Sequence, residues 1–168
     1  AELRGLWGTN VMDLGPTELE RARRALDERD MRVCSIASPA YKCHLFPELA
    51  AGEEGPLHLA TQRGLDEQVP LLERAFALAR YFDTKLIRIF AFWNQGPLTE
   101  DVFAAIVEAL RPGVALAERE DMILGLENEH ACFLGTGADT ARALAAIGSP
   151  NLRAIWDPGN AFFAGEKP

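Results

Sequence analysis

The sequence lacks the features that would place the protein in a membrane or an oxidising compartment. No apolar run reaches the roughly 18 residues of a membrane-spanning helix, and no basic segment followed by an apolar one forms a leader. The only cysteines are Cys34, Cys43 and Cys132, without close CxxC spacing and without a histidine or aspartate at triad-like spacing. We therefore expect a cytoplasmic protein with reduced thiols, no membrane partner and no covalent thiol catalysis.

Positive charge and histidine are also scarce, which bears on the class of ligand. There are 17 Lys and Arg residues against 25 Asp and Glu residues, so the formal net charge is −8. Binding to a phosphate backbone relies on clustered Lys and Arg, so we expect no nucleic-acid partner. No GxGxxG or GxxxxGKS motif follows a predicted strand, and the spacing of His44 and His58 suits no metal motif. The balance fits a small neutral ligand, or an acidic ligand that meets a local cation.

What the sequence does contain is an ordinary globular composition with alternating strand and helix patterns. Its 168 residues are 48% hydrophobic and 25% charged, enough for one domain with a core over residues 1–168. Residues 41–62 follow no pattern, and a loop of this length is often a lid or a binding loop. Apolar runs predict strands over 1–7, 31–37, 85–93, 122–130 and 152–157, and apolar spacing of three and four residues predicts helices over 16–30, 66–82, 99–119 (with a kink or a break at Pro112) and 136–147.

Strict alternation of strands and helical crossovers predicts parallel strands joined by right-handed connections. An open doubly wound sheet and part of a TIM barrel both satisfy this order. Carboxylates at the carboxyl ends of two neighbouring strands favour the barrel, so the predicted fold class is α/β, a partial (β/α)8 TIM barrel of about five βα units. The sequence opens without methionine in strand-like residues and stops just past a strand–loop unit. We therefore expect a single barrel domain that is truncated at both ends.

The sharpest candidate for chemistry is Glu127, near the end of the predicted strand 122–130. Alternate residues of a strand share a face, so Glu127 and Glu129 point to one side while Asn128 and the leucines point to the other. If the leucine face meets the helices, both carboxylates face the barrel axis, where a charge is unfavourable unless it is paired or bound to metal. The alternatives for Glu127 are therefore a metal ligand and a structural salt bridge inside the barrel, for example with Arg88.

Asp157 repeats this arrangement one strand further along, because Ile155 and Asp157 share a face at the end of the predicted strand 152–157. A divalent cation held by Glu127 and Asp157 at one rim of the barrel is one interpretation. The structural alternative is an aspartate that begins the turn formed with the following Pro-Gly-Asn, which is a common role.

Four further polar residues are candidates for substrate binding. Glu129 shares the face of Glu127, and His130 and Asn160 follow the two carboxylates closely, where they could hydrogen-bond substrate hydroxyls or orient a ligand. Lys42 could meet an anionic or hydroxylated ligand if its loop closes over the mouth. The structural alternative for His130 and Lys42 is a solvated surface side chain.

Five segments spread over the whole chain are informative together. They are Glu-Leu-Arg-Gly at 2–5, Ile-Ala-Ser-Pro at 36–39 with Lys42, Ile-Arg-Ile-Phe at 87–90, Leu-Glu-Asn-Glu-His at 126–130 and Trp-Asp-Pro-Gly-Asn-Ala at 156–161. These segments resemble the sugar phosphate isomerase/epimerase family, which has the xylose isomerase-like TIM barrel. The resemblance implies a metal held by a Glu after the fifth strand, an Asp after the sixth, a His after the seventh and a Glu after the eighth. Only the first two carry over, as Glu127 and Asp157, so the predicted strands resemble the second to sixth of the barrel.

The resemblance implies a divalent-metal-dependent isomerase or epimerase that acts on a sugar or sugar phosphate. Such an enzyme abstracts a proton beside a carbonyl and passes through an enediolate, with Glu127 as ligand and acid/base and with Mn, Mg, Co or Zn as the ion. An inosose-type dehydratase of the same fold is an alternative, and an abasic-site endonuclease is one that the negative charge disfavours. A non-catalytic alternative is an assembly module, because five strands leave two open edges that would pair with another copy in a homo-oligomer.

Overall fold

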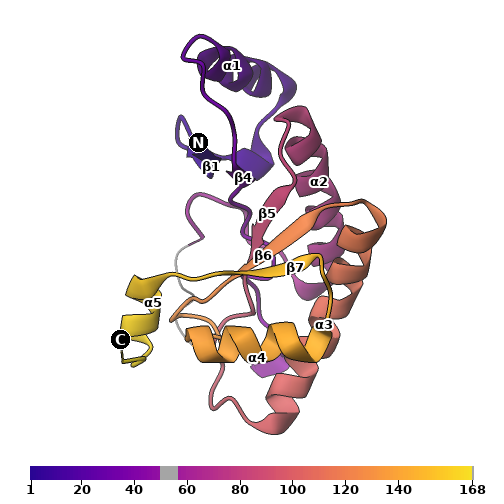
Figure 1. The fold of residues 1–168 in the computed structure, drawn as a ribbon, viewed down its shortest axis with the longest axis vertical. Coiled ribbons are helices and arrows are strands. Elements are labelled where there is room, and N and C mark those ends of the chain that lie inside the picture. The colour runs from indigo at the N-terminus through magenta and orange to yellow at the C-terminus, as the bar shows by residue number, and fades with distance from the viewer. Residues whose placement is uncertain (50–56, 168) are drawn as a thin grey trace.

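In the computed structural model, which describes residues 1–49 and 57–167, a five-stranded parallel sheet forms the centre of the molecule (Figure 1). The strands lie side by side in chain order, as alternation with helices predicts. The predicted α/β class with parallel strands is therefore confirmed. Residues 50–56 of the predicted irregular segment 41–62 lie outside the described residues. The strands are β1 (Glu2–Leu3), β4 (Ser35–Ile36), β5 (Leu86–Ile89), β6 (Ile123–Glu127) and β7 (Leu152–Ile155).

The predicted strand over residues 1–7 is wrong in one respect, because two elements share it. After β1 the chain forms β2 (Gly5–Leu6), which turns back and pairs antiparallel with β3 (Thr9–Asn10). Trp7 and Gly8 connect them with φ angles of 51° and 82°. A two-residue loop with positive φ at both positions matches the twist of an antiparallel pair. The apolar pattern does not reveal this turn, since a bulky residue such as tryptophan rarely adopts a positive φ.

The four long helices form where the sequence predicts them. Thr99 and Thr136 cap the third and fourth of them, because each side-chain oxygen accepts a hydrogen bond from a backbone amide of the first turn. Across the two described ranges, no helix has both the length and the apolar character needed to cross a membrane. The helices are α1 (Pro16–Asp27), α2 (Gln68–Tyr81), α3 (Glu100–Arg119) and α4 (Gly137–Ile147), joined by the short elements η1 (Val11–Asp13), η2 (Pro47–Leu49), η3 (Leu65–Glu67) and α5 (Pro158–Phe163).

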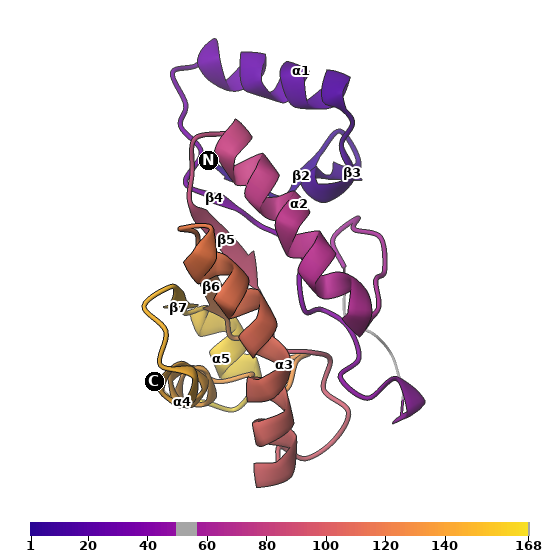
Figure 2. The same cartoon turned by 90° about the vertical axis from the view of Figure 1, so that its right-hand side faces the viewer.

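The long helices cover one face of the sheet, and the charged side chains of Arg88 and Glu127 lie on the other. Viewed from the helix side, α2 and α3 lie in front of the strands (Figure 2), and α4 packs against β7. Leu124 and Leu126 of β6 are fully buried in the core that this face forms with the helices. Gly125 and Glu127 alternate with them and point the other way, where a Cβ on Gly125 would lie 2.5 Å from Ile155 Cδ1. The leucine face therefore meets the helices, and Glu127 faces away from them.

Pro112 does not end α3, which runs through it as one helix. Leu110 and Val114 on either side are buried, so packing holds the segment helical despite the lost backbone donor. The residue after the proline, Gly113, leaves room for a buried side chain. A Cβ there would lie 2.2 Å from the Tyr41 hydroxyl oxygen and 2.7 Å from Leu72 Cδ1. Glycine is needed at this position for the close approach of Tyr41.

The carboxyl ends of β6 and β7 are joined by one buried side chain, that of Asn128. Its amide oxygen accepts a hydrogen bond from the Asp157 backbone N–H at 2.7 Å. Its amide nitrogen donates to the Asp157 carbonyl at 2.9 Å and to the Gly135 carbonyl at 3.2 Å. Asn128 is 0% exposed, so these bonds are shielded from water. The Asn128 side chain thus continues the pairing of β6 and β7 beyond Ile155, where their backbone ladder ends.

We predict that Gly113→Ala lowers the free energy of unfolding by about 1–3 kcal/mol, because the added methyl group overpacks a buried contact. Helix propensity alone predicts the opposite sign, a stabilisation of about 1 kcal/mol. Urea unfolding followed by circular dichroism measures the change. Glu108→Ala, on the exposed side of the same helix, is the matched control and should change stability by less than about 0.5 kcal/mol. A stabilised Gly113→Ala protein would contradict the packing argument.

We also predict that Asn128→Ala lowers the free energy of unfolding by about 2–4 kcal/mol, because it leaves buried backbone groups of Asp157 and Gly135 without partners. Thermal and urea unfolding measure the loss. Asn94→Ala is the control, since Asn94 is exposed and its side chain accepts a hydrogen bond from the Gly96 amide. An Asn128→Ala protein as stable as this control would mean that water replaces the amide at no cost.

Candidate functional site

The candidate site lies at the edge of the sheet where the parallel strands end. Glu127 is the last residue of β6, and Asp157 follows β7, whose last residue Ile155 pairs with Glu127. The carboxyl ends of parallel strands meet at one edge, so both carboxylates belong to the same rim. The sequence predicts this placement correctly.

Glu127 is a half-buried carboxylate next to a buried guanidinium. Its Oε2 atom lies 3.2 Å from Arg88 Nε, so the ion pair that is the structural alternative is present. Both atoms are buried, yet neither has a hydrogen-bond partner among the described residues. Burial raises the pKa of Glu127 above its ordinary value, Arg88 opposes this rise, and the charges of Asp157 and Glu129 add to it. The carboxylate is therefore held near a cation without being saturated by it.

Asp157 caps a short helix that the sequence analysis does not predict. Its Oδ1 atom accepts a hydrogen bond from the Asn160 backbone N–H at 2.9 Å, and Pro158 is the first residue of α5. The predicted turn after Asp157 is wrong, because its residues begin this helix. An aspartate followed by proline is a helix-start signal that would have revealed it. The cap uses Oδ1, and within the part of the chain that the structure describes Asp157 Oδ2 makes no hydrogen bond.

Lys42 is a buried residue, which contradicts the alternative of a solvated lysine. Its side chain is 1% exposed, and its Nζ atom lies 2.9 Å from Glu129 Oε2. The ammonium group also lies over the rings of Phe90 and Trp93, at 4.2 and 5.3 Å from their centres. The backbone sets this position, because the chain on either side of Lys42 accepts hydrogen bonds from the N–H groups of residues 90–93.

His130 and Asn160 contact each other at the same rim. His130 Nδ1 lies 2.8 Å from Asn160 Oδ1 and 3.0 Å from Glu129 Oε1. Both neighbours are acceptors, so Nδ1 carries a proton, and Nε2 is the nitrogen that points to neither of them. The His130 side chain is 48% exposed, so a ligand at the rim can reach it. Asn160 also donates to the Asn128 carbonyl at 3.1 Å, which anchors this pair to β6.

The structure brings all six predicted site residues to one rim, in two groups. Asn160 links the groups, because its backbone N–H is bound by Asp157 and its side chain contacts His130. Asn128 also helps to build the rim, although it was not among the predicted site residues. The signal was an amide on the leucine face of a strand, where a buried polar group must find partners. The groups are the carboxylate pair, Glu127 and Asp157, and the polar group, Lys42, Glu129, His130 and Asn160.

The donor set at the rim fits part of a metal site. Carboxylate oxygens are the ligands that hard divalent cations prefer, and Glu127 Oε2 is a buried oxygen to which none of the described residues donates a hydrogen bond. Over residues 1–49 and 57–167, no group of three or more His, Cys, Asp or Glu side chains is placed to hold a metal ion. Glu127 and Asp157 are therefore two candidate ligands that need others to complete a site.

A groove of about 540 Å³ lies elsewhere, between α1 and the β1–β2 segment. Its lining includes Leu3, Leu6, Ala22 and Leu26, and none of the six candidate residues. The rim is thus identified by the chemistry of its side chains and not by this groove.

Comparison with known proteins agrees with the architecture. The family model described as a xylose isomerase-like TIM barrel matches residues 2–168. No curated protein matches the sequence. Solved structures do match, at sequence identities that show the fold alone.

Three of these structures illustrate the range. A probable 3-DHS dehydratase, AsbF, from Bacillus anthracis has a TM-score of 0.64 at 20% identity, and the match covers 89% of this chain and 49% of AsbF. The 3-keto-D-glucoside 4-epimerase YcjR from E. coli has a TM-score of 0.63 at 16% identity, with coverage of 90% and 57%. A xylose isomerase-like protein from Mycobacterium smegmatis, in complex with magnesium, has a TM-score of 0.62 at 14% identity, with coverage of 89% and 49%.

The chain spans about half the length of the structures that it matches. Five parallel strands with helices on one face correspond to that share of a barrel, which confirms the predicted partial (β/α)8 fold. With this sheet and a family match over nearly every residue, the chain belongs to the xylose isomerase-like TIM barrel family, as the resemblance in its sequence predicts.

Proposed function

We propose that the protein is a metal-dependent isomerase or epimerase of a sugar or sugar phosphate, and that the rim is part of its active site. The observation that carries the proposal is the carboxylate pair on the ends of adjacent strands, with a buried Glu127 oxygen that no described hydrogen bond uses. The family supports the same class, and the matched structures include YcjR and an L-ribulose 3-epimerase.

Glu127 and Asp157 are the residues that would hold the ion. Bound there, Mn²⁺, Mg²⁺, Co²⁺ or Zn²⁺ would supply a Lewis acid for the carbonyl and hydroxyl oxygens of a sugar. Carboxylate ligands suit Mn²⁺ or Mg²⁺ better than a structural zinc. The matched structure from M. smegmatis is a complex with magnesium.

Glu127 is also the proposed acid/base. Removing a proton from a carbon beside a carbonyl needs a base with a pKa close to the working pH. Burial and nearby carboxylates raise the pKa of Glu127 in that direction, although Arg88 opposes them. The proton passes from the substrate carbon to a Glu127 oxygen and leaves an enediolate. A second acid then returns a proton to carbon, and we expect that group from strands that the matched barrels have beyond these five.

The polar group is proposed to bind substrate hydroxyls. The buried Lys42 ammonium fixes the Glu129 carboxylate, and Glu129 in turn contacts His130 Nδ1. His130 is thereby set to offer Nε2 to a ligand, and Asn160 holds the ring from its other side. Donors and acceptors that are fixed before binding suit a polyhydroxylated ligand, because these side chains lose little conformational entropy when the ligand binds.

A dehydratase of the same fold is the second candidate, and the match to AsbF favours it. Both reactions begin with removal of a proton beside a carbonyl, but a dehydratase then expels a hydroxyl group from the next carbon. Mass spectrometry of the product separates them, since loss of water changes the mass and epimerisation does not.

The non-catalytic alternative is a partial barrel that associates through the open edges of β1 and β7. It predicts a homo-oligomer without turnover of any sugar. An abasic-site endonuclease remains disfavoured by the net charge of −8.

We predict that Glu127→Gln in the intact protein lowers kcat at least about a hundredfold, because the amide cannot accept the proton. The assay follows product formation from D-fructose, D-allulose and L-ribulose by chromatography. Glu2→Gln is the matched control. It removes another carboxylate whose charge acts on Glu127, but that carboxylate accepts a hydrogen bond from Ser35, and turnover should stay within about threefold. Near-normal epimerisation by Glu127→Gln would refute the assignment.

We also predict that chelation of divalent metal by EDTA abolishes turnover and that added Mn²⁺ or Mg²⁺ restores it. Asp157→Asn should raise the metal concentration for half-maximal activity at least about tenfold, since it replaces a charged ligand with a neutral one. Asparagine also caps helices, so α5 and the stability should be preserved. Asp139→Asn, in the first turn of α4, is the control. Turnover that survives chelation would rule out metal dependence.

A further inference from the structure

Residues 57–63, which we call the strap, carry a histidine that the proposed mechanism does not use. The strap begins at Leu57, which packs against the buried cluster of Phe90, Trp93 and Cys132. Lys42 lies over the rings of Phe90 and Trp93, so this end of the strap lies beside the polar group of the rim. Two residues further on, Leu59 Cδ1 lies 3.6 Å from where a Cβ of Gly5 would be. The strap therefore connects the rim to the hairpin that follows β1.

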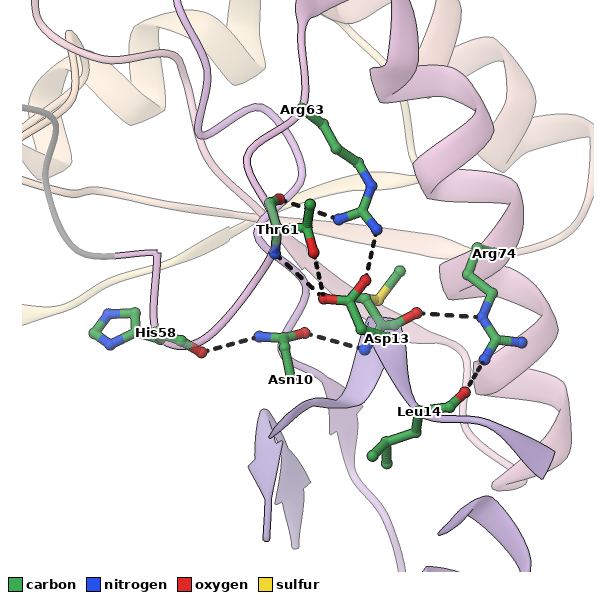
Figure 3. Close-up of polar contacts among 8 residues, drawn as sticks. Asn10, Asp13, Leu14, His58, Thr61, Arg63 and Arg74 are labelled. Carbon is green, nitrogen blue, oxygen red and sulfur yellow. Dashed lines mark hydrogen bonds and ion pairs between the residues drawn. The ribbon is translucent and has the colours of Figure 1, made fainter. Parts of the chain in front are cut away.

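The far end of the strap is fastened by the Asp13 carboxylate. Asp13 Oδ1 accepts a hydrogen bond from Arg63 at 2.6 Å, and Oδ2 accepts from the Thr61 backbone N–H at 3.2 Å and hydroxyl at 3.3 Å. Figure 3 shows the carboxylate between these two residues, with Arg74 on its other side. Partial burial acts to raise the pKa of Asp13, but the bonds from Arg63 and Thr61 outweigh it and hold this pKa below its ordinary value. The clamp is therefore charged at neutral pH.

The middle of the strap is held in an unusual backbone conformation. His58 and Leu59 have φ angles of 50° and 69°, in the left-handed region that residues with a side chain avoid. The His58 carbonyl accepts a hydrogen bond at 3.2 Å from the buried Asn10 amide, whose oxygen in turn accepts from the Met12 N–H. This bond turns the carbonyl toward Asn10 and the imidazole away from it, as Figure 3 shows. The contacts of Asn10 and Asp13 thus hold the backbone from which the ring projects.

Charged groups of the rim act on the His58 ring. Burial lowers the pKa of His58, and so do the charges of Lys42, Arg4 and Arg88, while Glu129 opposes them. Lys42 and Glu129 belong to the polar group, and Arg88 is the partner of Glu127. The ring is half-exposed and neutral at pH 7, so it can donate one hydrogen bond and accept another.

We propose that His58 is a ligand-binding residue of the rim, and that the strap and its Asp13 clamp position the imidazole to hydrogen-bond a sugar hydroxyl. The inference rests on the proposed function for the class of ligand. The packing of Leu57 beside Lys42 and the bond from Asn10 to the His58 backbone are independent of it. The strap reaches the hairpin that follows β1, and β1 and β7 are the two edges of the sheet, so His58 would meet the ligand from the side opposite to β7.

The test of binding uses the imidazole signals of His58 and His130 in the intact, Mg²⁺-loaded protein, followed by NMR during titration with D-fructose, D-allulose and L-ribulose. The signals are assigned from His58→Asn and His130→Asn variants. We expect both signals to shift with the same dissociation constant. A shift of His130 alone overturns the inference and leaves the proposed function standing. A shift of His58 alone keeps the inference and counts against the proposed site. If neither signal moves with any of these sugars, both proposals fail.

The test of positioning is a double-mutant cycle with dissociation constants as the readout. His58→Ala should weaken binding about tenfold, by loss of one hydrogen bond. Asp13→Asn should weaken it about threefold or more, and the double variant should bind no more weakly than His58→Ala, because Asp13 acts through His58. Additive effects would overturn the role of the clamp.

Arg74→Gln is the matched control for this cycle. Arg74 holds the same 12–14 segment from α2, by bonds to the Met12 and Leu14 carbonyls, and within the described residues its side chain makes no hydrogen bond to the strap. It should lower the unfolding midpoint while affinity stays within about twofold, and its effect should add to that of His58→Ala. Should Asp13→Asn not fold, Thr61→Val removes one of the clamp bonds and takes its place in the cycle.

Discussion

The rim depends on the hydrogen bonds of one buried amide. A carboxamide offers a donor and an acceptor side by side, as a peptide group does, so the Asn128 side chain pairs with the Asp157 backbone as a neighbouring strand would. β6 and β7 consequently stay together beyond the point where their ladder ends. Removing the amide would leave polar groups buried without partners, which is more unfavourable than the gain from an ordinary hydrogen bond. The relative position of Glu127 and Asp157 is therefore held by Asn128, which is neither a proposed acid/base nor a proposed metal ligand.

The carboxylates of Glu127 and Glu129 each have their own cation, but the two pairs are not equivalent. Glu129 is hydrogen-bonded to a lysine that aromatic rings enclose, whereas Glu127 is only close to Arg88 and keeps a buried oxygen without a bond. A saturated carboxylate has little left to offer a ligand, and its role is to hold its neighbours. An unsaturated one can accept a proton or a cation. The contrast supports a positioning role for Glu129 and a chemical role for Glu127.

Much of this arrangement could be predicted because it follows from periodicity. The leucines of β6 and the apolar run of β5 specify buried strands, and the parity of residues along β6 places Glu127 opposite the leucines. The hairpin at Trp7 and the left-handed residues of the strap could not be predicted, because positive φ at a bulky residue follows from tertiary contacts and not from propensity. The burial of Lys42 also follows from tertiary contacts, since the rings that cover it, Phe90 and Trp93, come from the segment after β5. The pair Asp157-Pro158 indicates the start of α5, because aspartate is a favoured N-cap and proline a favoured first helical residue. The interpretation of this pair as a turn was wrong because it left out the cap.

The same cap has a consequence for affinity. An aspartate on a free loop loses rotamer entropy when it closes on a ligand, and that loss weakens binding. Here the Asp157 side chain is already held by its bond to the Asn160 N–H, and the proline that follows restricts the backbone of Asp157. The formation of the six-residue helix α5 has therefore ordered this carboxylate before any ligand binds. A ligand of Asp157 Oδ2 would bind more tightly as a result, because the entropy of ordering the side chain is already lost on folding.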